Sequence, residues 1–123
     1  ISVDGVNVEV EDGKELREYF DLIKKRIDRI EVVNSGLMGI DGKFDFFNLS
    51  DIFEYMDDEV FRINYERLSE LSKCGSEVVY YNMQGKRYLD DGFELLKNES
   101  HEYTQKMQAY FYNEFLIYKA SKK

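Results

Sequence analysis

Three turn dipeptides flanked by alternating apolar residues constrain the fold of this 123-residue chain most strongly. Asp4-Gly5, Asp41-Gly42 and Gln84-Gly85 each place a glycine where a two-residue β-hairpin needs a positive φ angle. After each hairpin, apolar residues recur three or four positions apart, which indicates an amphipathic helix. The sequence therefore predicts an α+β fold: an antiparallel sheet built from three β-hairpins, each followed by an amphipathic helix packed on one face.

The predicted elements divide the chain into three successive ββα units, near residues 1–30, 37–73 and 77–120. Beyond the turns the units share little sequence, so an internal repeat and a chance alternation of hairpins and helices both remain open. No proline-rich or glycine-rich linker separates the units. We therefore expect a single α+β domain over residues 1–123.

The apolar spacing predicts the helix boundaries within these units. The first helix starts at Lys14 and ends near Ile30. The second follows an N-cap at Asn48 or Ser50, contains a break at residues 57–59 and ends near Lys73. The third is expected from Ser100 to about Ala120.

Composition and charge exclude several classes of function. The 25 acidic residues outnumber the 17 basic ones, and the resulting net charge of −8 argues against a nucleic-acid-binding surface. No apolar stretch reaches the roughly 20 residues that a membrane-spanning helix needs. The phosphate-binding and serine-hydrolase motifs GxxxxGK[ST], GxGxxG and GxSxG do not occur. We therefore expect a cytoplasmic protein that is not an enzyme and has no cofactor.

The single histidine and the single cysteine do not form recognisable sites. His101-Glu102 begins a pattern like the zinc-binding HExxH helix, but Gln105 stands where the second histidine is required. The segment Asp41–Asp45 is similar to half of a calcium loop, and three ligand positions of that loop are missing. Cys74 is predicted at a helix C-terminus, where the helix dipole disfavours a thiolate. We expect no metal and no catalytic residue.

Aromatic residues account for 15% of this acidic chain. Tyrosine is enriched at protein interfaces, and clustered carboxylates steer a protein toward a cationic partner. We therefore predict a protein-binding module that neutralises a basic protein partner, in the physical manner of immunity proteins that block nuclease toxins or of phage inhibitors of nucleic-acid enzymes. The predicted steering residues are Asp57, Asp58, Glu59, Asp90 and Asp91, and the predicted anchors are Tyr81 and Tyr112.

An interaction or oligomerisation domain of a larger structural or regulatory protein is the alternative function. The chain begins at Ile1 rather than at methionine, which favours this interpretation. A homo-oligomer would then form through the aromatic helix or through an exposed strand edge. The abundance of Lys, Asn, Ile, Tyr and Phe is typical of AT-rich genomes, which indicates a bacterial or phage source.

Overall fold

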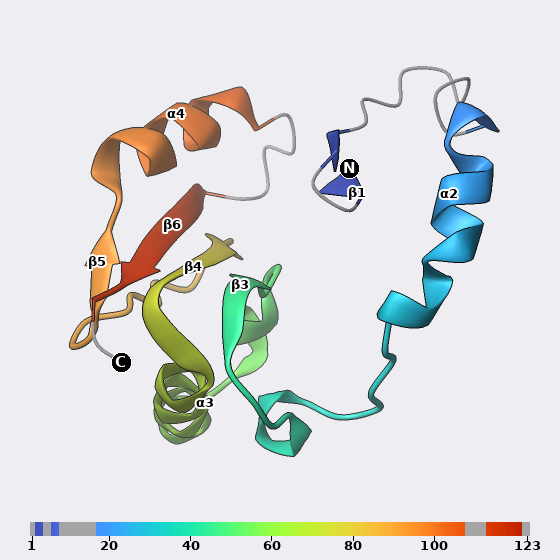
Figure 1. Ribbon diagram of the computed structural model, residues 1–123. Helices are drawn as coiled ribbons and strands as arrows, with labels where there is room; N and C mark the ends of the chain where they lie inside the picture. Colours follow the sequence, from blue (N-terminus) through green and yellow to red (C-terminus); the bar gives the residue numbers. More distant parts are fainter. Residues whose placement is uncertain (1, 4–5, 8–16, 108–112, 122–123) are drawn as a thin grey trace. The chain divides into compact units, whose positions relative to one another are not determined.

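The structure is a computed structural model that describes residues 2–3, 6–7, 17–107 and 113–121 (Figure 1). The chain divides into two compact units, residues 1–34 and 35–123. The predicted α+β class is confirmed, because a four-stranded sheet occurs together with helices. The predicted arrangement of three antiparallel hairpins is not confirmed, because the four-stranded sheet is mixed.

The first unit contains a short antiparallel ribbon and a short helix. Strand β1 (Ser2–Val3) pairs with β2 (Val6–Asn7), with Val3 opposite Val6 as the first predicted hairpin requires. Helix α2 (Phe20–Lys25) is followed by the 3₁₀ helix η1 (Ile27–Arg29), so the predicted helix is interrupted within the described residues. No residue of α2 is buried. Residues 8–16, which include the start of the predicted helix, lie outside the described residues.

The second unit is built on a mixed sheet with the strand order β3-β4-β6-β5. Strand β3 (Phe44–Asn48) runs parallel to β4 (Ser72–Asn82). Both β4 and β5 (Phe93–Leu95) run antiparallel to β6 (Glu114–Ala120). A parallel pair needs a long crossover connection, and the 3₁₀ helix η3 (Ile52–Tyr55) and helix α3 (Asp58–Leu71) supply it between β3 and β4.

The second and third predicted hairpins do not form. Instead of a strand, the 3₁₀ helix η2 (Leu37–Gly39) precedes β3. After Gln84-Gly85 the chain does not pair with β4, because β6 occupies that edge. The side chain of Asn82 instead bonds to the backbone carbonyl of Arg87 at 3.1 Å. The Gln84-Gly85 turn does not produce a hairpin here, because β6, a longer apolar strand, pairs with the same edge of β4.

The third predicted helix is correct only in its first half. Helix α4 (Lys97–Lys106) ends before Met107, and residues 114–120 form β6 instead. Leu116 and Tyr118 face the core, whereas Phe115 and Ile117 lie on the other side of the sheet. A strand that is covered on both faces has a continuous run of apolar residues. Such a run also contains the three- and four-residue spacings that indicate the apolar face of a helix. Tyr110–Tyr112 lie outside the described residues.

The core of the second unit lies between one face of the sheet and α3 with η3. Leu68 and Leu71 of α3 are fully buried against Val78 and Tyr80 of β4. Phe53 of η3 packs edge-on against Tyr80, with ring centroids 5.0 Å apart. This helical layer therefore fixes one face of the sheet and leaves the other face to α4 and solvent.

The helical stretch is broken as predicted, but the break lies at residues 56–57, and Asp58 and Glu59 already belong to α3. The carboxylate of Asp57 accepts the backbone N–H of Val60 at 2.8 Å and so caps α3. The predicted N-cap at Asn48 or Ser50 is wrong, because η3 and the break intervene. The prediction that Cys74 ends this helix is also wrong. Strand β4 begins at Ser72, directly after α3, and contains the exposed Cys74.

A bulge near the start of β4 depends on Gly75. The pairing with β3 jumps from Phe44–Ser72 to Phe46–Glu77, so β4 carries extra residues at this point. Gly75 has a φ angle of +90°, and the hydroxyl of the next residue, Ser76, donates to the carbonyl of Phe44 at 2.6 Å. The bulge therefore combines a left-handed backbone with a specific hydrogen bond.

We expect Gly75→Ala to lower the free energy of unfolding by about 1–2 kcal/mol, because an L-residue is strained at this φ angle. Added steric contact does not contribute, since a Cβ at Gly75 meets no atom within 4 Å. Gly36→Ala is the matched control: its Cβ also meets open space, and its φ of −82° suits alanine. Urea unfolding measures both variants, and an equal loss in the two would contradict the strain argument.

Candidate functional site

The candidate site lies on the side of the sheet that faces away from α3. We call this side the outer face and define it by Phe46 and Asn48 of β3, Glu77, Val79 and Tyr81 of β4, and Phe115 and Ile117 of β6. These residues alternate along their strands with the buried residues that face α3. Figure 1 shows α4 and α3 on opposite sides of the sheet.

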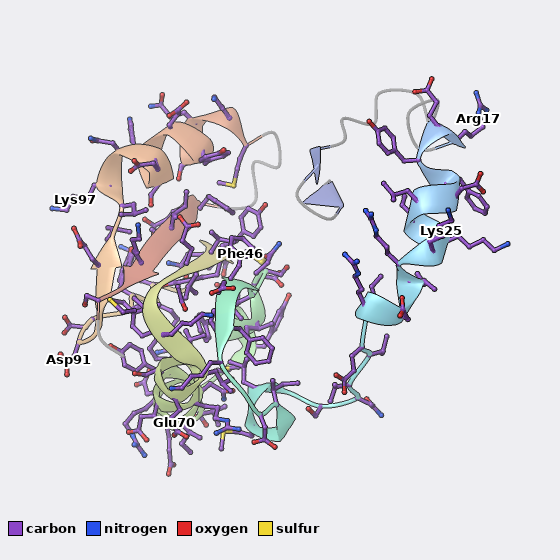
Figure 2. All side chains as sticks on the ribbon, viewed as in Figure 1. Arg17, Lys25, Phe46, Glu70, Asp91 and Lys97 are labelled. Atoms are coloured by element: carbon purple, nitrogen blue, oxygen red, sulfur yellow. The ribbon has the colours of Figure 1, made fainter. Side chains whose placement is uncertain are left out.

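Helix α4 covers only part of the outer face. The hydroxyl of Ser100 accepts the backbone N–H of Ile117 at 2.9 Å, and the hydroxyl of Thr104 accepts that of Phe115 at 3.0 Å. These bonds hold α4 over β6. Strand β3, at the edge of the sheet, keeps Phe46 exposed at 56% (Figure 2).

An open groove of about 450 Å³ lies between α4 and the uncovered part of the outer face. Phe115 forms its aromatic centre, with ring centroids 4.9 Å from Tyr81 and 5.7 Å from Tyr103. Tyr103 of α4 is 52% exposed, so the groove presents aromatic surface to solvent. The outer-face residues of β3, β4 and β6 form the floor, and Leu96, Glu99 and Tyr103 form the wall.

Two carboxylates line this aromatic groove, Glu77 from β4 and Glu99 from α4. Both residues are exposed, and within the described part of the chain neither makes an ion pair. Many of the basic residues of the second unit are engaged with acids elsewhere: Arg62, Arg67, Lys73, Arg87 and Lys106. The groove is therefore aromatic and has two carboxylates in its lining, and Lys119 of β6 lies opposite Glu77 in the strand register.

The predicted steering acids lie on the other side of the sheet, around α3. Asp57 caps the helix, and Asp58 pairs with the guanidinium of Arg87 at 2.5 Å. Glu59 is exposed in the first turn of α3. The hydroxyl of Tyr65 accepts the backbone N–H of Asp90 at 3.1 Å and donates to the carbonyl of Asp91 at 2.5 Å. The acids at residues 57–59 and the pair Asp90 and Asp91 therefore both lie beside α3.

Tyr81, a predicted anchor, lies in the groove, and Tyr112 lies outside the described residues. Phe46, Glu77, Glu99 and Tyr103 were not predicted as site residues. The adjacent Phe46 and Phe47 carry a usable signal, because neighbouring residues of a strand face opposite sides. Phe47 is buried and Phe46 is exposed, so two phenylalanines in a row indicate an apolar outer face.

No set of three or more His, Cys, Asp or Glu side chains that could hold a metal ion occurs in the described ranges. None of the described helices combines the length and the apolar character needed to cross a membrane.

The turn after β4 is held by Glu54 of η3. Its carboxylate accepts the backbone N–H groups of Met83 at 3.1 Å, Gln84 at 2.8 Å and Gly85 at 2.7 Å. The bond from Gly85 is the largest cause that lowers the pKa of Glu54 below its ordinary value of 4.5. This contact fixes the chain that directly follows the groove residue Tyr81.

We expect the stabilisation from Glu54 to disappear in acid. Because its pKa is lowered by folding, the ionised carboxylate stabilises the fold above pH 4.5, and this stabilisation is lost as the pH falls through the lowered pKa. The advantage of the wild-type chain over Glu54→Gln should be constant near neutral pH and shrink below pH 4.5. Urea unfolding from pH 7 to pH 3 measures it, with the exposed Glu94→Gln as control. Parallel profiles for wild type and Glu54→Gln would refute the assignment.

Comparison with family models, with curated proteins and with solved structures found no match for this chain. The function is therefore inferred from the geometry of the groove and from the charged residues around it.

Proposed function

We propose that this chain is a non-catalytic, acidic protein-binding module that neutralises a basic protein partner. The observation that carries the proposal is the groove on the outer face, where four aromatic rings lie beside two carboxylates without ion-pair partners among the described residues. Aromatic rings supply large contact areas at low entropic cost. The carboxylates need a cationic group when the groove is covered, because burying an unpaired charge is costly. A nuclease toxin or another nucleic-acid enzyme offers such cationic groups.

Long-range attraction supports the same partner. The net charge of −8 raises the rate of encounter with a cationic surface, and salt screens this effect. The acids around α3 contribute to this field even where they also stabilise the fold. Replacing Asp57, Asp58 and Glu59 by serine should slow association, and serine at position 57 retains a residue that can cap α3.

Self-association is the second candidate, and the exposed edge of β3 favours it. Phe44 and Phe46 are 40% and 56% exposed on this five-residue edge strand. Exposed apolar edge strands readily pair with other strands. In this case the chain would be an oligomerisation domain of a larger protein, and its acidity would serve solubility.

A pull-down from lysate at low and at high salt tests the proposal. The wild-type chain should retain one basic protein at low salt and release it at high salt. The variant Glu77→Gln/Glu99→Gln should retain much less of it, whereas Glu94→Gln, which removes a charge outside the groove, should behave like wild type. Recovery of the chain alone, or of the same proteins at both salt concentrations, would refute a basic partner and support self-association.

A further inference from the structure

Strand β3 has an open edge beside the groove. It lies at the end of the strand order and pairs only with β4 among the described strands. The backbone N–H of Leu49 donates to the carbonyl of Val79 at 3.0 Å, on the side of β4. Backbone groups alternate between the two edges of a strand, so those of Phe46 and Asn48 point to the open edge.

The open edge and the groove share residues. Phe46 and Asn48 present their backbone groups at the edge, and both also line the groove. A strand added next to β3 would lie about 4.8 Å away, and every second side chain of it would lie on the outer face. Those side chains would reach the aromatic rings and the carboxylates of Glu77 and Glu99. When a strand is added to a sheet edge, pockets beside that edge bind its alternate side chains and provide the specificity. The groove lies in this position.

Charge selects the kind of strand that fits. Asp45 of β3, with a side chain that is 84% exposed, lies next to Phe46 and pairs with Lys73. Lys73 balances the charge of Asp45, so the negative charge beside the edge comes from Glu77 and Glu99 on the outer face. A second copy of β3 would bring a second set of these acids to the same place, whereas a basic strand would neutralise them.

We propose that β3 captures an extended basic segment of the partner as a fifth strand of the sheet. Alternate lysine or arginine side chains of this segment lie on the outer face, where their charged ends pair with Glu77 and Glu99 and their aliphatic stems lie on the exposed rings of Phe46 and Tyr103. The inference rests on the proposed function, which supplies the basic partner, and it adds the binding mode.

Fluorescence anisotropy with a labelled nine-residue peptide of alternating lysine and valine tests the groove. The peptide should bind the wild-type chain, and a peptide with glutamate in place of lysine should not. Phe46→Ala and Glu77→Gln/Glu99→Gln should each weaken binding about tenfold, because the first removes an aromatic contact surface and the second removes the carboxylates that pair with lysine. Glu94→Gln should change the affinity less than about twofold. No binding of the lysine peptide, or equal weakening by Glu94→Gln, would overturn the proposal.

Two N-methylated versions of the same peptide test strand addition itself. One version carries N-methyl groups on alternate residues, and the other carries them on the remaining residues. A strand beside β3 uses the N–H groups of only one set, so one version should lose binding and the other should keep it. Equal binding of the two, or equal loss, would show that no strand is added.

Two further outcomes separate this inference from the proposed function. A basic protein that is captured in the pull-down but still binds Phe46→Ala with full affinity would leave the proposed function intact and overturn strand addition. A concentration-dependent dimer in sedimentation equilibrium that the lysine peptide does not dissociate would show that a second copy occupies the edge, and this too would overturn the inference.

Discussion

Phe53→Ala is expected to lower the free energy of unfolding by about 3–5 kcal/mol, the usual range for removing a buried phenylalanine. Phe53 is 1% exposed and packs edge-on against Phe61 and Tyr80, with ring centroids 4.9 Å and 5.0 Å away. Its removal leaves a cavity between η3, α3 and β4 that the fully buried Tyr80 cannot fill. Urea unfolding followed by circular dichroism measures the change.

Phe46→Ala is the control for Phe53→Ala, because it removes the same side chain from the opposite face of the sheet. Phe46 is 56% exposed, so its truncation should cost less than about 1 kcal/mol. A similar destabilisation of the two variants would show that the outer face is part of the folding core rather than a binding surface. If Phe46→Ala is stably folded, a loss of peptide binding by this variant reports the lost contact and not unfolding.

Arg67→Ala should lower the free energy of unfolding by about 2–3 kcal/mol, because it removes hydrogen-bond donors from two partly buried carbonyls. The guanidinium of Arg67, 17% exposed, donates to the carbonyls of Leu37 and Ile40 and pairs with Asp41 at 2.8 Å. These contacts fasten η2 and the segment before β3 to α3. Chemical denaturation measures the loss.

The comparison of Arg67→Ala with two further variants identifies the cause. Arg67→Lys should recover little stability, because a single ammonium group cannot reproduce the fork of donors. Arg62→Ala removes an exposed pair with Glu66 and should change the free energy of unfolding by less than about 0.5 kcal/mol. Full stability of Arg67→Lys would mean that charge alone, and not the geometry of the bonds to the carbonyls, holds this segment.

Local sequence signals predicted the local features of the fold. The first hairpin register, the strand at Phe44–Phe47 and the break at Asp57 all depend on residues close together in the chain. The strand partners could not be predicted in this way, because the parallel pairing of β3 with β4 joins segments separated by α3. Strand β6 was predicted as helix, since its two buried faces remove the alternation that identifies a strand.

The candidate site was predicted only in part for the same reason. Adjacent acids such as Asp57 and Asp58 are conspicuous in the sequence, yet one caps a helix and the other pairs with Arg87. Glu77 and Glu99 are each isolated in the sequence, and only the packing of α4 on the sheet brings both to one groove. Tyr81 was predicted because the run Val78–Tyr81 places apolar residues on both faces of a strand.

Hydrogen–deuterium exchange of the chain with and without the captured basic partner tests the central claim most directly. If the outer face binds this partner, exchange should slow in β3 and in the α4 segment around Glu99 and Tyr103, and the first turn of α3 should be unchanged. Protection confined to residues 57–59 and 86–92, with β3 exchanging as in the free chain, would contradict the claim and place the interface on the acids around α3.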